Sequence, residues 1–342
     1  MFENIFQKYI TAKNIIFFVT VILFLVFIST IKDVAIMFFA SYVISCSLNP
    51  IVDKIQNKIK NRSIASAVVL LGALCIIMVI TVPLALLVGN EVKNFSTSLP
   101  AYFNDFSTEI AKIPFINKFN ALQFNWEGLI SAASNYASEI FNEIINIGLN
   151  VGSTLIYLIV SLIIIYYFMA DKDIIEKTYL RLFPKNMREK AGNILNIISK
   201  KIGGYIFALI ITVSSVFIVM SVGLLIFNVN YAVIMGVITA ILDIIPIVGP
   251  AIALVICIVA SFETGPAAIA AVIGVFAIAQ LVENQFVRPY VFGKFLDIHP
   301  IMIYLFLFIT AKYMGATGVI LAPAVAATAC VLIEELYMKN LD

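Results

Sequence analysis

Long apolar runs separated by short polar segments fill most of the chain after residue 14. Three of these runs are NIIFFVTVILFLVFISTI, SIASAVVLLGALCIIMVITVPLALLV and IYLIVSLIIIYYFMA. Each approaches or exceeds the roughly 20 apolar residues that an α-helix needs to cross a bilayer. The pattern predicts an all-α, polytopic integral membrane protein.

The charges between the runs predict the orientation of the spans. NPIVDKIQNKIKNRS carries four basic residues and one acid, and residues 171–201 carry eight basic residues and four acids. Residues 90–147 lean towards acids instead. Because short loops rich in Lys and Arg stay in the cytoplasm, we expect both termini there and residues 90–147 outside.

The same segments divide the chain into three parts. Residues 1–89 hold three spans, over about 14–31, up to about 48, and over about 64–88, and residues 90–147 form an extracytoplasmic amphipathic helical segment. Residues 148–342 form a core that begins with a span over about 148–170. Its segment 171–201 pairs an apolar with a basic helical face, which suits an interfacial helix, although the basic residues also serve as ordinary topology determinants.

The apolar stretch 231–262 is interrupted by DIIPIVGP, which contains Asp243, Pro246, Gly249 and Pro250. Proline has no N–H and clashes with the preceding turn, so the prolines should break a helix. The break leaves about 15 residues on each side, which is marginal for two full spans, so a re-entrant hairpin fits better than two short spans. In lipid, a broken helix is tolerated only where its backbone is buried in protein or lines a wet cavity.

A second broken stretch lies near the C-terminus, where Gly315, Gly318 and Pro323 interrupt the apolar residues from 301 to 333. Helix-plus-hairpin units over 202–262 and 266–337 then enter the membrane from opposite sides, as in an inverted repeat. Discontinuous helices at corresponding positions of two inverted halves mark transport sites. The two glycines would equally suit close helix packing.

The candidate pathway residues are polar groups near these breaks. Asp243 is expected to have a functional role, the alternative being a helix cap. Glu283, Asn284 and Arg288 form either a local salt bridge or a gate, and Lys312 either snorkels to the interface or pairs with Asp243 or Glu283. His299, the one histidine, either titrates near neutral pH or caps a turn before Pro300.

Three ordered motifs resemble the autoinducer-2 exporter family of bacterial membrane proteins. They are DIIPIVGP, QLVENQFVRPYVFGKFLDIHP and GATGVILAPAVA, and they add Gln280 and Pro289 to the candidate residues. The resemblance implies about eight membrane segments, a bacterial plasma-membrane location and a homo-oligomer, with a pentamer as one option. Lys312 departs from the small or apolar residue expected there, which bears on the solute that the cavity prefers.

Composition agrees with the membrane assignment and excludes several chemistries. The chain is 62% hydrophobic and 12% charged, against about half apolar and a quarter charged in soluble domains. Four scattered cysteines and one histidine offer no metal-site spacing, and we expect no cofactor and no nucleic-acid partner. No His-Glu-x-x-His, Gly-x-Ser-x-Gly or phosphate-binding loop is present, so we do not expect an enzyme.

The sequence leaves three functions open. The leading one is a secondary transporter that exports a small polar solute such as autoinducer-2, a quorum-sensing signal, by alternating access around the broken helices. The second is a sodium(lithium)/proton antiporter in which the titrating group is Asp243, either alone or together with Glu283. The third is a membrane scaffold that does not transport.

Overall fold

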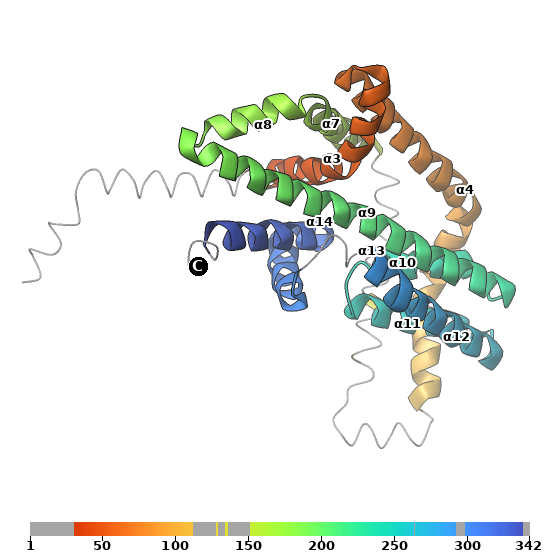
Figure 1. Cartoon of the computed structure of the whole chain (residues 1–342). Helices are drawn as coiled ribbons and strands as arrows, with labels where there is room; N and C mark the ends of the chain where they lie inside the picture. The colour runs from red at the N-terminus through yellow and green to blue at the C-terminus, as the bar shows by residue number, and fades with distance from the viewer. Residues whose placement is uncertain are drawn as a thin grey trace, which may run out of the picture.

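The computed structural model describes residues 31–111, 128, 134–135, 151–262, 264–291 and 298–337, and these are helical with no strand among them (Figure 1). The predicted all-α fold is therefore confirmed. The span over about 14–31 and most of the predicted external segment beyond residue 111 lie outside the described residues. The main helices are α3 (Lys32–Ile59), α4 (Arg62–Ala111), α7 (Val151–Ala170), α8 (Lys172–Arg181), α9 (Arg188–Ile226), α10 (Ala232–Leu242), α11 (Val248–Ser261), α12 (Pro266–Val282) and α14 (Pro300–Leu336).

Five of the described helices are long and apolar enough to cross a membrane, and α7 together with α8 forms a sixth candidate span that is bent by 77°. The first half of α4 shows why these helices need lipid. Only 6% of its most apolar window, within Arg62–Leu84, is buried in the protein. Leu71 and Ile76 are 61% and 63% exposed, so their environment has to be hydrocarbon. The chain is therefore a polytopic membrane protein.

Three helices are longer than the sequence pattern suggests. The second predicted span does not end near residue 48, because α3 continues through Pro50 to Ile59. The third predicted span agrees with the apolar part of α4, Arg62–Leu84, but the helix itself continues to Ala111. No backbone break separates the predicted interfacial segment 171–201 from the span after it, since α9 runs through residue 201. Ile194, Ile198 and Ile202 keep one buried helical face across that point, which explains the continuity.

Helix α9 is the central element of the core and packs against α3, α10, α12 and α14. Two polar contacts fix this arrangement. The hydroxyls of Tyr42 on α3 and Ser199 on α9 lie 2.8 Å apart. The Tyr205 hydroxyl donates to the Ile320 carbonyl of α14 at 2.7 Å. Both contacts join segments that are more than 100 residues apart in sequence, so α9 connects the N-terminal helices with the C-terminal broken helix.

Arg62 fastens α3, α4 and α7 together at the end of the predicted cytoplasmic turn. Its Nε donates to the Met169 carbonyl at 2.7 Å, and Nη1 donates to Asp53 Oδ1 at 2.7 Å. Further bonds join Nη1 to Gln56 at 2.8 Å and Nη2 to Asn49 at 2.9 Å. The guanidinium of Arg62, on α4, thus donates hydrogen bonds to groups on both α3 and α7. Its planar fork of donors suits this role.

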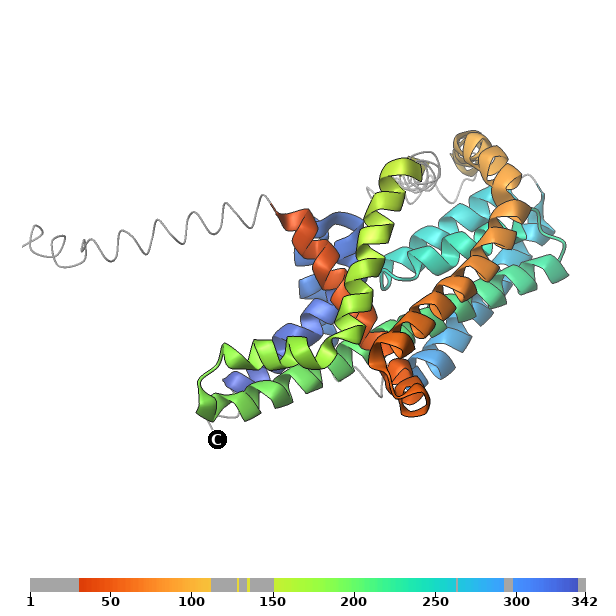
Figure 2. The same cartoon turned by 90° about the horizontal axis from the view of Figure 1, so that it is seen from above.

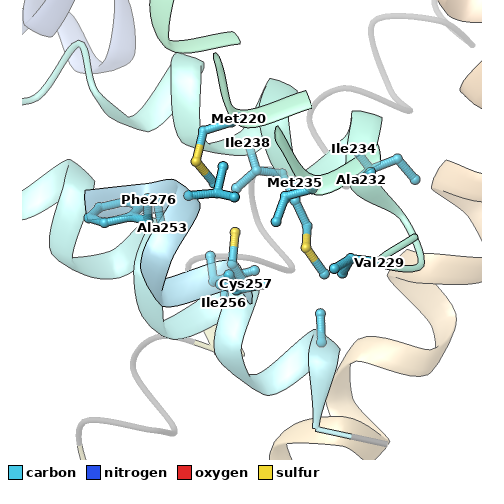
Figure 3. Packing of buried hydrophobic residues seen from close by; sticks show 14 of the residues in the cluster. Met220, Val229, Ala232, Ile234, Met235, Ile238, Ala253, Ile256, Cys257 and Phe276 are labelled. Carbon is cyan, nitrogen blue, oxygen red and sulfur yellow. The ribbon is translucent and has the colours of Figure 1, made fainter. Parts of the chain in front are cut away.

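Helices α10 and α11 form the predicted first hairpin. The Thr239 hydroxyl lies 3.7 Å from Cys257 Sγ, and the Ser261 hydroxyl lies 3.9 Å from Met235 Sδ. The later residue of α10 thus contacts the earlier residue of α11, and the earlier residue contacts the later one. The two helices are therefore antiparallel. Figure 3 shows how their apolar side chains pack with α9 and α12; it labels Met220, Ile234, Met235, Ile238, Ala253, Ile256, Cys257 and Phe276.

The C-terminal half of α4 packs against the two open ends of this hairpin. The Phe95 ring meets Tyr231, just before α10, at 5.1 Å between centroids. The Phe106 ring meets Phe262, just after α11, at 5.4 Å. Phe95 is fully buried, and this packing explains why α4 remains helical beyond the hydrocarbon layer.

The second broken segment lies inside α14, as the sequence predicts. Gly315 has φ 61° and ψ −143°, a backbone conformation open to glycine and strained for other residues. The two arms on either side of this kink point in different directions (Figure 1). Pro323 lies within the second arm without ending it. A break at Gly315 is thus present, while a re-entrant path for this segment stays a prediction.

Candidate functional site

The break between α10 and α11 lies against the C-terminal end of α12, and two acidic side chains meet there. Asp243 is the residue after α10, and its side chain is fully buried. Glu283 follows α12 and is also fully buried. Gln280, one turn earlier on α12, donates to Asp243 Oδ1 at 3.2 Å and to Glu283 Oε2 at 3.4 Å. One amide therefore bridges carboxylates from two different elements.

Arg288 supplies the positive charge of this cluster. Its Nε donates to Glu283 Oε1, and its Nη2 lies 3.9 Å from Asp243 Oδ2. The Arg288 side chain is 35% exposed, whereas both carboxylates are buried. One guanidinium thus serves two acids, and the pairing with Glu283 is much the tighter. Buried carboxylates need such partners, because an unpaired buried charge is strongly destabilising.

A short π-helix explains why Glu283 and Arg288 can pair. Residues Glu283–Val287 form one π turn, in which the Arg288 N–H donates to the Glu283 carbonyl. In a regular α-helix, residues five apart point about 140° away from each other, at about 100° per residue. The wider turn brings them to one side. Helix α13 (Arg288–Val291) then resumes the α-helical backbone and contains Pro289.

Asn284 orients the bridging amide. Its Nδ2 donates to the Gln280 carbonyl at 2.9 Å and to Gln280 Oε1 at 3.4 Å. Because the Gln280 oxygen is held this way, its NH2 group faces Asp243 and Glu283. Each polar residue of QLVEN thus has a defined contact in the cluster, and so has Arg288.

The hairpin tip is held in a strained backbone conformation. Ile247 has φ 68° and ψ −56°, and the Val248 N–H donates to the Pro246 carbonyl at 2.8 Å. This is the rare γ-turn with positive φ, which is unusual for a β-branched residue. Gly249 is required beside it, since a Cβ there would lie 1.7 Å from the Leu242 carbonyl oxygen. Pro250 lies in the first turn of α11, where a missing N–H costs nothing, so only Pro246 is inside the break.

One oxygen of the cluster has no hydrogen-bond donor. Asp243 Oδ2 is buried and accepts no hydrogen bond from the described residues, and its ion-pair contact among them is with Arg288, 3.9 Å away. Buried polar atoms are normally hydrogen-bonded, and exceptions call for an explanation. The side chain does not serve as a helix cap, the alternative raised by the sequence, because its contacts are with Gln280 and Arg288.

The other predicted pathway residues lie on the second broken segment. Lys312 forms no ion pair with Asp243 or Glu283; its ammonium lies 5.9 Å from the centre of the Tyr313 ring. His299 caps α14, because its Nδ1 accepts from the Ile301 N–H at 3.3 Å. Pro300 is the first residue of α14, and Gly318 follows the kink, with the Thr310 carbonyl 2.1 Å from where its Cβ would be. The structure thus does not join these residues to the Asp243 cluster.

Within the described parts of the chain, no group of three or more His, Cys, Asp or Glu side chains could hold a metal ion. No feature of the sequence marks Ile247 or the π turn. A positive φ at a β-branched residue and an extra residue in a helix leave no local pattern that would reveal them.

A buried charged cluster at the tip of a short-helix hairpin, inside a multi-span helical protein, defines a membrane protein of the transporter class. Sequence comparison gives the particular family. The AI-2E family transporter model matches residues 15–338, and the chain belongs to that family. The resemblance noted from the three motifs is confirmed.

Three similar proteins come from Bacillus subtilis (strain 168). The one named "Putative transport protein YueF" is 25% identical over 317 residues, which cover 89% of this chain and 84% of YueF. "Putative transport protein YtvI" is 23% identical over 84% of both chains. "Putative transport protein YrrI" is 26% identical over 52% of this chain, and the match spans half of the length of YrrI.

Proposed function

We propose that this protein is a secondary transporter that exports a small polar solute, such as autoinducer-2, across the bacterial plasma membrane. The observation that carries the proposal is the buried cluster of Asp243, Gln280, Glu283 and Arg288 at the hairpin tip. Membership of a transporter family supports the general class. The solute, the direction and the orientation of the termini are part of the proposal.

The cluster offers complementary groups to a solute that carries hydroxyls. Asp243 Oδ2 has no donor of its own, so a solute hydroxyl could donate to it. Arg288 is 35% exposed at its side chain and could donate to a solute oxygen without leaving Glu283. Such a site recognises a neutral, polar molecule through one acceptor and one cation.

Alternating access would require the hairpin tip to move relative to α12. The polar link between the tip and α12 is weak for a buried site, since it consists of one amide hydrogen bond of 3.2 Å and an ion contact of 3.9 Å. Apolar side chains of α11 also pack against α12, so a movement of the tip has to slide or hinge on that packing. The ion pair of Glu283 and Arg288 lies within α12 and its π turn and can stay intact during such a movement.

The test uses purified protein in proteoliposomes and a panel of radiolabelled polar solutes that includes autoinducer-2. We expect wild-type protein to move at least one solute and Gln280→Leu to lose most of that flux, because the bridge to Asp243 is gone. Glu189→Gln is the control. It changes one exposed polar side chain near the start of α9, outside the Asp243 cluster. A wild-type protein that moves no solute of the panel would refute the proposed cargo class.

The second candidate is a sodium(lithium)/proton antiporter, and the unpartnered, buried Asp243 Oδ2 favours it. A carboxylate oxygen that accepts no hydrogen bond can bind either a proton or a small cation, as exchange of the two requires. A pH jump should then drive sodium flux into proteoliposomes, and Asp243→Asn should abolish it. If the wild type shows neither cation nor solute flux, the scaffold function becomes the better account.

A further inference from the structure

Helix α8 leaves the end of α7 in the direction expected of a helix on a membrane surface. Helix α7 is a 20-residue apolar helix, long enough to cross the hydrocarbon layer at about 1.5 Å per residue. Only Asp171 separates it from α8, and the axes of the two helices differ by 77°. If α7 crosses the bilayer, α8 runs nearly parallel to the surface and begins at the height where α7 ends.

One face of α8 is occupied by protein. Leu180 lies against α9, with its methyl groups 3.7 Å from where a Cβ on Gly192 would be. At about 100° per residue, the face opposite Leu180 carries Ile174, Ile175 and Leu182, the last directly after the helix. Leu182 is 79% exposed and Ile174 is 64% exposed. Most of the surface of Ile174 and of Leu182 is therefore left uncovered by the described residues, whereas Ile175, 38% exposed, is partly covered.

The arrangement of the backbone places the face of α8 opposite α9, the apolar strip, on the side where the bilayer lies if α7 spans it. In Figure 2, α8 extends sideways from the end of α7, and the first part of α9 lies on the side of α8 away from the body of α7. The face opposite α9 is therefore on the same side as the body of α7. In a membrane-spanning arrangement of α7, that side is the bilayer.

Basic residues flank the strip. Lys177 and Arg181 lie on one side of it, Lys185 follows in the next turn, and all three are exposed. Lys172 is held near Asp53, 4.0 Å away, and contributes less. An apolar strip bordered by exposed cations is the surface that binds to the boundary between headgroups and acyl chains, and each nearby cation adds attraction to anionic lipids.

We propose that the face of α8 formed by Ile174, Ile175 and Leu182 docks onto the adjacent leaflet, and that Lys177, Arg181 and Lys185 make it select anionic phospholipid. A second copy of the chain is the less suitable occupant. A symmetric contact would place the same three cations opposite one another, which like-charge repulsion disfavours. The proposal rests on the membrane class of the protein and not on the transported solute.

The test places a tryptophan on the strip. The chain has one tryptophan, so Leu182→Trp in a Trp126→Phe background gives one indole at an exposed position. The full-length protein is reconstituted in vesicles of fixed phosphatidylcholine and phosphatidylglycerol content. In one preparation the phosphatidylcholine is brominated, and in the other the phosphatidylglycerol is. We expect both to quench the indole, and brominated phosphatidylglycerol to show at least about 5-fold higher apparent affinity, because one basic residue near the surface already gives about that factor. Ile174→Trp in the same background should give the same result if the first variant does not fold.

Charge variants complete the test. Neutralising the flanking cations to glutamine should bring the phosphatidylglycerol preference to about 1-fold, because the electrostatic attraction is removed. Neutralising three exposed lysines on the α3–α4 side should leave the preference unchanged, although the charge change is the same. Equal quenching by both lipids, or a preference that survives the first variant, overturns the anionic selectivity. An unquenched indole overturns the docking, whether water or a second copy covers it. The two triple variants are Lys177/Arg181/Lys185→Gln and Lys54/Lys58/Lys60→Gln.

Discussion

Arg288→Met is the most informative single change, because it removes the one cation that pairs two buried acids. Glu283 and the Asp243 side chain have no exposed surface, so the substitution leaves uncompensated charge in the site. Breaking a buried ion pair from one side typically costs about 3–5 kcal/mol. Because the Arg288 side chain is 35% exposed, water screens part of the interaction, and we expect a loss of about 2–3 kcal/mol.

The same reasoning predicts a rescue. Glu283→Gln in the Arg288→Met background removes the more closely paired of the two acidic charges that the first change leaves without a cation. The double variant should therefore recover most of the lost stability, whereas independent effects would add. Arg288→Lys should be intermediate, since a lysine keeps the charge but lacks the planar fork of donors that meets both acids.

Thermal unfolding of the purified protein in detergent measures these differences. At about 2–4 °C per kcal/mol, Arg288→Met should lower Tm by about 5–10 °C. Arg181→Met, on the exposed α8, is the matched control and should change Tm by less than about 1 °C. An Arg288→Met variant as stable as the wild type, or a double variant that is less stable than both singles, would refute the view that this pair neutralises buried charge.

Three further changes test other parts of the fold. Gly249→Ala should destabilise by about 3 kcal/mol through the clash with the Leu242 carbonyl, while Gly274→Ala, which meets no atom within 4 Å, should be neutral or better; Tm distinguishes them. Arg62→Leu should cost about 2 kcal/mol, because it removes the charged donor that joins three helices, and it should speed proteolysis of the α3–α4 turn. Phe95→Ala should cost about 3–5 kcal/mol by opening a cavity at the outer end of the hairpin, and hydrogen exchange in α10 should rise.

Strong local signals account for what the sequence predicts well. Pro246 and the neighbouring acid and glycine interrupt an otherwise apolar stretch, so the position of the first break follows from proline geometry and lipid insolubility of open backbone. Gly315 marks the second break for the same kind of reason. The helix Pro266–Val282 is found where its apolar run lies, with proline at its first position.

Contacts that depend on tertiary packing were less accessible. The sequence raises a local salt bridge for Glu283 and Arg288, but five-residue spacing argues against it in an α-helix, and the π turn that allows it has no sequence mark. That Gln280 joins Asp243 to Glu283 depends on how the hairpin lies against α12. Helix ends were misplaced where packing or continuing periodicity extended the helix past the apolar run, as at Ile202.

The unbroken length of α9 has a mechanical consequence. Its 39 residues form a rod of about 58 Å at 1.5 Å rise per residue. A rod of that length that pivots by about 10° at one end displaces its other end by about 10 Å. The same rod touches α8 near its start and α10 and α12 further along. A tilt of one end of α9 thus moves the other end, because no break in the helix separates them. Contacts that restrain the start of α9 therefore also limit how far the hairpin can move.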